Sequence, residues 1–202
     1  MKRQFDVALG GILLILTAPV FLLAALAVAF DGGAVFFRQT RAGLFGRPFL
    51  MLKFRSMRAH QTPALSPHEV TSTDPLVTST GKWLRRFKID ELPQLLNVIR
   101  GDMSLVGPRP ALLEQAAEYG DYECRRLAVK PGMTGWTQVN GGIEISWPDR
   151  ILLDVWYVDH CSLLLDLKIL LRTFAVVFFG DASNHSALRA AKIHAAHPGW
   201  GD

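Results

Sequence analysis

Two adjacent carboxylates, Asp90 and Glu91, directly follow a cluster of cations in the sequence. Pro93 comes soon after them, and Pro is tolerated in the first turn of a helix, where its missing N–H would have no partner. We therefore expect the pair at a helix N-terminus, where the macrodipole favours an ionised carboxylate by a few tenths to about 1 kcal/mol. Ionised carboxylates beside cations and a phosphate site suit a nucleophile or a metal ligand. The cations are Lys82, Arg85, Arg86 and Lys88.

Apolar residues after the carboxylates recur at helical spacing and predict one apolar helix face, formed by Leu92, Leu95, Leu96 and Ile99. Capping of that helix is the plain alternative role for Asp90 and Glu91, since Asp and Glu are common in first turns. Further on, Arg109 stands between two prolines. A rigid loop that presents one Arg suits bidentate phosphate recognition, although a simple turn explains this fragment equally well.

The composition limits the classes of protein to consider. A chain of 202 residues supports one domain with room for an appendage, and its formal charge of +4 points to polyanionic partners such as nucleic acid, anionic lipid or phosphorylated substrates. A nucleic-acid binder is not favoured because no helix-turn-helix, RNP-like or zinc pattern is present. Cys124 and Cys161 are isolated, so we expect reduced thiols facing the cytosol. The histidines lack paired-ligand spacing, so zinc is not expected.

An uncharged apolar segment occupies residues 7–30. As a helix it would be about 36 Å long, enough to cross a hydrocarbon core of about 30 Å. A signal peptide is disfavoured because the run exceeds the usual apolar region of about 7–15 residues and no clear cleavage site follows. The segment therefore predicts a membrane helix.

Cations flank both ends of this segment, and cations favour the cytoplasmic side of a membrane. Pro19 lies inside it, where Pro removes a hydrogen bond and bends a helix. A kinked, re-entrant helix that enters and leaves on one face satisfies both facts, although the residues alone leave a simple span equally open. Lys2 and Arg3 precede the segment, and residues 32–68 contain no acid but hold Arg38, Arg41, Arg47, Lys53, Arg55 and Arg58.

The remaining chain predicts short strands and several helices. We expect strands at 34–38 and 49–54, joined by a basic turn, then a long polar loop over 60–80. The pattern is mostly helical over 111–128, a turn over 130–135, extended over 136–140, and helical over 148–160 and 162–179. The last of these helices is apolar but carries Asp166, Lys168 and Arg172, which suits a position in the membrane interface. A short helix and a loose end are expected over 180–202.

Eight stretches, taken together and in order, resemble one family, the bacterial monotopic phosphoglycosyl transferases. They are KRQFD (2–6), the apolar segment broken at Pro19, RQTRAG (38–43), KFRSM (53–57), IDELPQLLNV (89–98), GDMSLVGPRP (101–110), KPGMTGWTQVNG (130–141) and LDVWYVDHCSLLLDLKIL (153–170). The chain begins at the hydrophobic segment of the catalytic unit and so resembles the minimal members of the family.

The resemblance implies a fold and a location. The fold is α+β and mainly helical, with a re-entrant membrane helix at residues 1–31, a small membrane-associated catalytic domain at 32–180 with interfacial amphipathic helices, and a tail at 181–202. The expected location is the bacterial inner (cytoplasmic) membrane, with the catalytic domain on its cytoplasmic face. A homodimer is left open by the sequence.

The resemblance also implies a reaction with Mg²⁺ as cofactor. A phosphosugar would pass from a UDP-sugar to polyprenyl (undecaprenyl) phosphate and release UMP, as the first membrane step of glycoconjugate or exopolysaccharide assembly. On this interpretation Asp90 attacks the β-phosphorus and forms an aspartyl-phosphosugar intermediate, Glu91 binds or positions Mg²⁺, and Lys53, Arg85 and Arg109 hold phosphate oxygens. The competing class is a non-enzymatic, membrane-anchored basic adaptor in which the carboxylates only cap a helix.

Three positions depart from the family pattern. Ala18 stands where Ser often precedes the kink proline, so the kink lacks that hydroxyl. Gly142 replaces an Arg that is often linked to nucleotide-sugar binding, which puts the identity of the sugar in doubt. Lys88 replaces a small polar residue and adds a charge beside Asp90.

Overall fold

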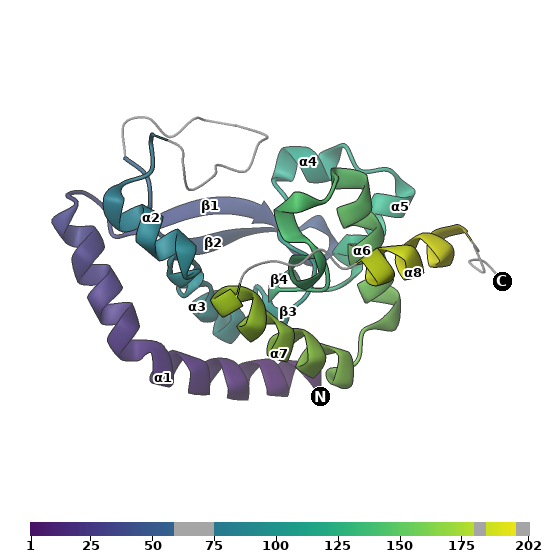
Figure 1. Ribbon diagram of the computed structural model, residues 1–202, viewed down its shortest axis with the longest axis horizontal. Coiled ribbons are helices and arrows are strands. Elements are labelled where there is room, and N and C mark those ends of the chain that lie inside the picture. Colours follow the sequence, from purple (N-terminus) through teal and green to yellow (C-terminus); the bar gives the residue numbers. More distant parts are fainter. Residues whose placement is uncertain (59–74, 180–184, 197–202) are drawn as a thin grey trace.

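The computed structural model describes residues 1–58, 75–179 and 185–196. Two small sheets lie among helices, and a long bent helix runs along one edge of the molecule (Figure 1). The N-terminal half has the elements α1 (Lys2–Phe30), β1 (Phe36–Ala42), η1 (Leu44–Gly46), β2 (Pro48–Phe54), α2 (Ser79–Arg86), η2 (Ile89–Glu91), α3 (Gln94–Arg100) and β3 (Ser104–Val106). The C-terminal half has α4 (Leu113–Ala117), α5 (Asp121–Cys124), η3 (Arg125–Ala128), β4 (Gly132–Thr134), η4 (Gln138–Asn140), η5 (Gly142–Glu144), α6 (Trp147–His160), α7 (Leu163–Phe179) and α8 (His185–Ala196).

Helix α1 is continuous but sharply bent, as Figure 1 shows, and Pro19 lies inside it. Pro19 has no N–H to offer the carbonyl of Ile15, so one hydrogen bond of the helix is missing there. The hydroxyl of Thr17 donates to the carbonyl of Leu13 at 2.7 Å, a side-chain bond that often accompanies a bend. Thr17 therefore supplies a hydroxyl near the kink, although Ala18 does not. By length and composition, α1 is able to cross a membrane.

Both ends of α1 are tied to the rest of the molecule. At its start, Lys2 forms an ion pair with Asp166 of α7, and the buried Asp6 accepts hydrogen bonds from the hydroxyl and backbone N–H groups of β3. At its end, Arg55 donates to the carbonyl of Val28 at 3.2 Å, and Thr80 donates to Asp31 at 3.0 Å. The helix is thus held at two separated points by one domain.

Strands β1 and β2 form an antiparallel hairpin, with Phe36 opposite Phe54 and Ala42 opposite Pro48. One face of the hairpin packs on α1 through Phe21, Phe36 and Phe54, whose rings lie 4.9–6.2 Å apart. Its neighbour α3 is joined to β2 by the fully buried Asn97, which accepts from Leu52 N and donates to Leu50 O. The hairpin and α3 therefore form one rigid unit next to the carboxylates.

Strand β4 corrects the sequence prediction, because 130–135 was expected to be a turn. Residues 132–134 instead pair in parallel with β3, Ser104 opposite Gly132 and Val106 opposite Thr134. The pairing needs close backbone approach: a Cβ at Gly107 would lie 2.4 Å from the carbonyl oxygen of Lys130. The prediction of an extended 136–140 is also wrong, since that segment is a turn followed by η4.

Most other elements agree with the sequence prediction. Both strands of the hairpin, α6 and α7 are confirmed within a few residues, and the helical pattern over 111–128 is broken into short pieces, α4, α5 and η3. The predicted polar loop over 60–80 lies for its greater part outside the described residues, and its last two residues begin α2. Within the predicted tail, α8 packs on α6, and its Ala187 and Ala191 are buried in the main core.

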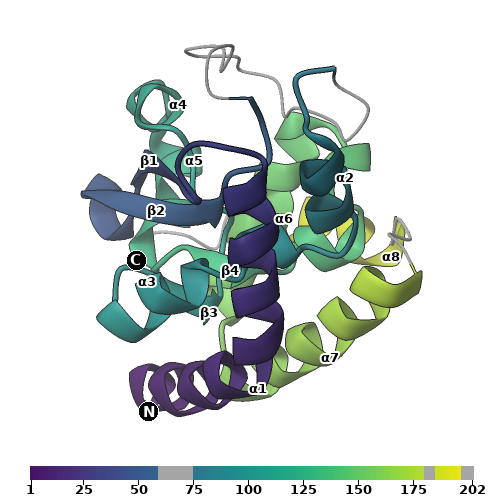
Figure 2. The same cartoon turned by 90° about the vertical axis from the view of Figure 1, so that its left-hand side faces the viewer.

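Helices α1 and α7 lie along the same lower edge of the molecule in two perpendicular views (Figures 1 and 2). Both helices expose large apolar side chains. On α7 these recur at helical spacing, at Leu164, Leu167, Leu171 and Phe174. On the first half of α1 they include Ile12, Ile15 and Leu16. Both helices therefore present exposed apolar side chains, and on α7 they follow the amphipathic pattern predicted for 162–179.

Candidate active site

The two carboxylates lie in the 3-10 turn η2, one turn before α3 begins at Gln94. The carboxylates were predicted to lie at a helix N-terminus, and they lie instead in the 3-10 turn that precedes the helix. The turn follows Lys88, which has the left-handed conformation (φ 56°) and reverses the chain after α2. Asp90 is 7% exposed, and Glu91 is partly buried.

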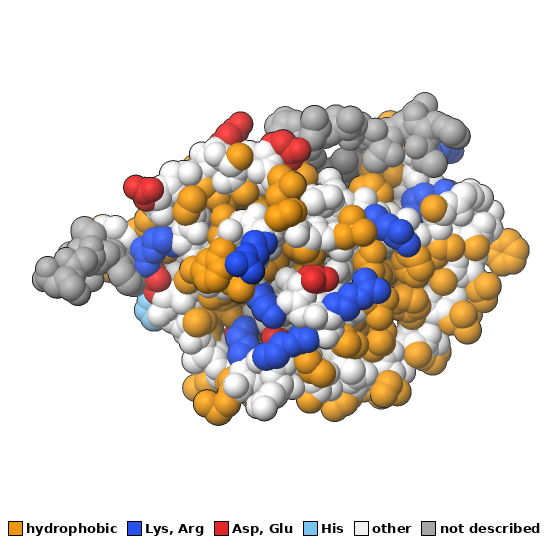
Figure 3. All heavy atoms as spheres, turned by 180° about the vertical axis from the view of Figure 1, so that it is seen from behind, with side chains coloured by type: hydrophobic (Ala, Val, Ile, Leu, Met, Phe, Trp, Pro, Cys, Tyr) orange, Lys and Arg blue, Asp and Glu red, His pale blue; other side chains and the backbone are white. Residues whose placement is uncertain are grey.

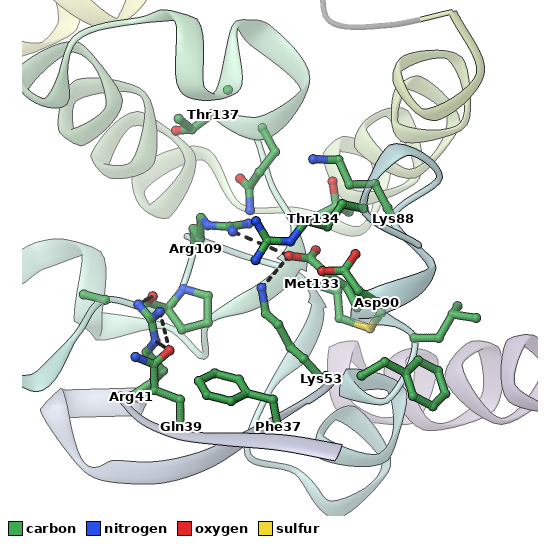
Figure 4. Close-up of a pocket in the computed structure, with 18 of the residues that line it drawn as sticks. Phe37, Gln39, Arg41, Lys53, Lys88, Asp90, Arg109, Met133, Thr134 and Thr137 are labelled. Carbon is green, nitrogen blue, oxygen red and sulfur yellow. Dashed lines mark hydrogen bonds and ion pairs between the residues drawn. The ribbon is translucent and has the colours of Figure 1, made fainter. Parts of the chain in front are cut away.

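Lys53 and Arg109 converge on Glu91 from different elements (Figure 4). Lys53 Nζ, on β2, lies 2.8 Å from Glu91 Oε1, and Arg109 Nη2, in the loop after β3, lies 3.5 Å from the same oxygen. The side chain of Arg109 is 42% exposed. Its guanidinium thus faces the solvent-filled space as well as Glu91, a position from which it could also reach a bound anion.

The adjacent carboxylates have different electrostatic environments. Burial, and secondly the charge of Glu91, raise the pKa of Asp90, and Lys53, Arg85 and Lys88 only partly oppose this. Burial also acts to raise the pKa of Glu91, but Lys53 and Arg109 outweigh it and hold that pKa well below its usual range. The macrodipole argument predicted that the ionised form of Asp90 is stabilised, which would lower its pKa. Burial raises this pKa instead, so the predicted direction is wrong.

Arg85 and Lys88 also lie near the carboxylates, on the chain that leads into η2. Arg85 Nε donates to Ser56 Oγ at 2.9 Å, which fixes α2 against the end of β2. Both cations line the same cavity as Asp90, and both lower its pKa through their charge. The structure therefore brings all the sequence-predicted site residues together except Pro19, which lies inside α1.

The loop that carries Arg109 is held at successive backbone groups. Gly107 N–H donates to Thr134 O, Pro108 O accepts from Gly132 N–H, and both bonds are 2.9 Å long. Arg126 Nη2 donates to Arg109 O at 3.1 Å, and Arg41 Nη1 donates to Pro110 O at 3.3 Å. The two flanking prolines thus belong to a loop with a fixed backbone, as the sequence predicted.

A cavity of about 2070 Å³ surrounds the carboxylates. Figure 3 shows cations gathered around acidic side chains in a hollow, with apolar surface extending below it. The polar side is formed by β1 and the segments from α4 to α6, including Gln39, Arg41, Tyr119, Arg126 and Arg150. The apolar side is formed by α1, α3 and α7, including Leu13, Leu95, Leu170, Val176 and Val177. Asp90 lines the same cavity as both sets of residues (Figure 4).

Sequence reasoning missed the buried polar residues that position the site. Asn97 links α3 to β2, Asp6 links α1 to β3, and Arg126 holds the Arg109 loop. A polar residue within a helix of apolar periodicity is a signal that could have found Asn97 and Asp6. Arg126 gives no such signal, because its carboxylate partner Asp154 is 28 residues away in the chain.

The chain is similar to known proteins of one family. The family model described as "Bacterial sugar transferase" matches residues 1–180. The chain is 45% identical to "Uncharacterized sugar transferase EpsL" of Bacillus subtilis, over 92% of both chains. It is also 45% identical to "UDP-glucose:undecaprenyl-phosphate glucose-1-phosphate transferase" of Caulobacter vibrioides, over 85% of this chain and 67% of that one.

A further relative, "Undecaprenyl-phosphate glucose phosphotransferase" of Komagataeibacter xylinus, is 43% identical over 85% of this chain. The chain spans only 35% of that protein's length. The family match extends from the start of α1 to just beyond the end of α7 and so includes every residue of the candidate site. The chain therefore belongs to the bacterial sugar transferase family of enzymes.

Proposed function

We propose that this protein transfers a phosphosugar from a UDP-sugar to polyprenyl phosphate, with undecaprenyl phosphate as the acceptor, and releases UMP. The observation that carries the proposal is the position of Asp90 in one cavity that is lined by both cationic and apolar side chains. A transferase for these substrates must bring a polar nucleotide and a lipid phosphate to one reacting group. The names of the relatives from Komagataeibacter and Caulobacter support this substrate pair.

The polar wall suits the donor and the apolar wall suits the acceptor. Lys53 and Arg109 offer charge-assisted hydrogen bonds to phosphate oxygens, and Arg85 adds a further cation. The apolar wall includes α1 and α7, whose outer surfaces expose large hydrophobic side chains. A polyprenyl chain lying in the membrane could place its phosphate in the cavity without leaving that apolar edge.

The chemistry proceeds by two displacements at one phosphorus atom. A carboxylate oxygen of Asp90 attacks the β-phosphorus of the UDP-sugar, the bond to the bridging oxygen breaks, and UMP leaves with that oxygen and the electron pair. A phosphate oxygen of the polyprenyl phosphate then attacks the aspartyl-bound phosphorus and releases the carboxylate. Polyprenyl-diphosphate-sugar is the product. Phosphoryl transfer depends mainly on positioning and charge stabilisation, which Lys53 and Arg109 supply.

Glu91 is the residue that we propose to hold Mg²⁺. No group of three or more His, Cys, Asp and Glu side chains that could hold a metal occurs in the described part of the chain. This fits Mg²⁺, which usually binds one or two carboxylates together with waters and substrate phosphates. Glu91 stays ionised because of Lys53 and Arg109, and Asp90 is its direct neighbour. When bound, Mg²⁺ would neutralise charge on the phosphates.

The fixed ends of α1 support a re-entrant membrane helix with the catalytic domain on the cytoplasmic face. Lys2 pairs with Asp166 of α7, and Asp31 accepts from Thr80 of α2. A straight span would place these two ends on opposite sides of the bilayer, whereas the contacts hold both on one domain. A homodimer is not part of the proposal.

The topology can be tested with single cysteines at positions 4 and 34, which are both exposed. They are introduced into a Cys124→Ser/Cys161→Ser background, because both native thiols are exposed. In spheroplasts, a membrane-impermeant maleimide is expected to label both sites only after the membrane is opened. Labelling of either site in intact spheroplasts would mean a true span.

The nucleophile is tested with Asp90→Asn. The variant is expected to release no UMP from UDP-sugars in the presence of polyprenyl phosphate and Mg²⁺, while the exposed-site control Asp121→Asn keeps wild-type turnover. With UDP-sugar alone, the wild type is expected to gain the mass of one phosphosugar on the Asp90 peptide. Normal turnover of Asp90→Asn overturns the nucleophile assignment. An inactive wild type would instead favour the adaptor alternative. A panel of UDP-sugars in this assay identifies the sugar.

A further inference from the structure

Two neighbouring arginines of η3, Arg125 and Arg126, form parallel ion pairs with α6. Arg125 Nη2 lies 2.5 Å from Asp159 Oδ1, and Arg126 Nη2 lies 2.5 Å from Asp154 Oδ2. The side chain of Arg125 is 27% exposed, and that of Arg126 is 3% exposed. Both ion pairs join η3 to α6 at the same distance. They differ in burial and in the other groups that each guanidinium contacts.

Arg126 has a second set of contacts that lead into the active site. Its Nη2 donates to the carbonyl oxygen of Arg109 at 3.1 Å, and its Nη1 donates to the hydroxyl of Tyr119 at 2.5 Å. Asp154 is held in turn by the hydroxyl of Thr137, at 2.6 Å. The guanidinium is also flanked by the rings of Tyr119 and Trp147, at 5.5 and 5.4 Å. Its position is therefore fixed from several directions.

We propose that Arg126, fixed by Asp154, is a positioning residue that holds Arg109 in the orientation needed to bind the donor phosphates. The inference rests on the proposed function, since it assigns a role to Arg109 in binding the UDP-sugar. The link is direct. Arg126 donates to the backbone carbonyl of Arg109, and the side chain of Arg109 contacts Glu91.

The arrangement requires an arginine rather than any cation. A planar guanidinium presents several N–H donors in fixed directions and can serve the acceptors on Arg109, Tyr119 and Asp154 together. A lysine in the same place would keep the charge opposite Asp154 but would offer one compact ammonium group on a different stem. Arg126→Lys is therefore expected to preserve the ion pair and release the Arg109 carbonyl.

The experiment compares Arg126→Lys with Arg125→Lys in the full-length protein, reconstituted in bilayer nanodiscs. Steady-state UMP release gives kcat and KM for the UDP-sugar, titration calorimetry gives the Kd of UDP with Mg²⁺, and thermal unfolding gives Tm. Arg126→Lys is expected to lower kcat/KM on the order of 10- to 100-fold, because small misplacement of a positioned group has effects of this size. Arg125→Lys is expected to change kcat/KM less than about twofold, because its ion pair with Asp159 joins η3 to α6 and is only partly buried.

A double-mutant cycle separates positioning from a general loss of stability. If Arg126 acts through Arg109, then Arg126→Lys weakens UDP binding in the wild-type background but changes Kd by less than about twofold in an Arg109→Ala background. An equal loss in both backgrounds overturns the proposal. Tyr119→Phe, which keeps the ring but removes one acceptor, is a milder second variant and is expected to weaken UDP binding in the same background-dependent way.

Failure of this inference differs from failure of the proposed function. If the wild type neither releases UMP nor binds UDP, both are overturned. If the wild type is active and Arg126→Lys behaves like Arg125→Lys, only the positioning role is overturned.

Discussion

The side chains of Asp90 and Glu91 are adjacent in the chain, yet their pKa values are displaced in opposite directions. Asp90 is buried and forms no ion pair within the described part of the chain, whereas Glu91 receives Lys53 and Arg109. Such a division suits the two roles proposed above for the carboxylates. A buried, weakly stabilised carboxylate is more reactive toward phosphorus, and a permanently ionised one suits a divalent cation.

This division predicts opposite effects of two isosteric substitutions on folding. The folded-state pKa of Asp90 is raised, so its ionised form opposes folding, and the penalty is present above that pKa and absent below the unfolded value of 3.8. Asp90→Asn is therefore expected to increase the free energy of unfolding at pH 7. The folded-state pKa of Glu91 is lowered, so its stabilising contribution is present above the unfolded value of 4.5 and lost as the pH falls. Glu91→Gln is expected to destabilise the protein at pH 7.

The measurement is Tm in detergent between pH 4 and pH 8. The difference of Asp90→Asn from the wild type is expected to shrink toward pH 4, whereas that of Glu91→Gln starts to shrink only below about pH 4.5 and is still large at pH 4. A lower Tm for Asp90→Asn at pH 7, in a protein that retains its circular-dichroism spectrum, would contradict the assignment of a buried, unfavourable charge.

Removal of Lys53 predicts a shift in the pH dependence of activity. Lys53 lowers the pKa of both carboxylates, so Lys53→Met raises both, and the acid limb of kcat/KM moves to higher pH. At pH 7 we expect a loss of about 100-fold or more, because a preorganised cation at the phosphate site is removed as well. The control is Arg47→Met, an exposed cation on the turn after η1. A uniform loss at all pH values would mean that Lys53 acts only on the substrate.

The sequence predicted the parts of the site that are encoded locally. Lys53, Arg85, Asp90, Glu91 and Arg109 line one cavity, and Pro19 lies inside the bent helix α1. The direction of the pKa shift at Asp90 was predicted wrongly. Position in a helix is encoded locally, whereas burial depends on the whole fold. Strand β4 was missed because three residues that pair with a distant strand carry no periodic pattern. Arg126 was missed for the same reason, since its role depends on Asp154 and Arg109.

The ion pair between Lys2 and Asp166 predicts that the start of α1 stabilises the whole domain. Asp166 is 1% exposed and also accepts from the hydroxyl of Tyr157 at 2.6 Å. Lys2→Met leaves this buried carboxylate without its cation, and we expect a loss of about 1–3 kcal/mol in the free energy of unfolding. Arg3→Met is the matched control, because Arg3 bonds only backbone carbonyls of α3, one of them from an exposed position. Equal effects of the two substitutions on Tm would mean that the buried ion pair adds nothing specific.

The contact between the Arg109 loop and β4 predicts that Gly107 tolerates no side chain. A Cβ at this position would lie 2.4 Å from Lys130 O and 2.9 Å from Gly132 N, and both are backbone atoms that cannot rotate away. Gly107→Ala must therefore separate β3 from β4 and move Arg109, with a loss of stability of about 1–3 kcal/mol. Gly11→Ala is the control, since a Cβ there meets no atom within 4 Å. In the UMP-release assay, Gly107→Ala is expected to lower kcat/KM far more than Gly11→Ala. Wild-type kcat/KM and Tm in Gly107→Ala would show that the loop can move away from β4 without disturbing Arg109.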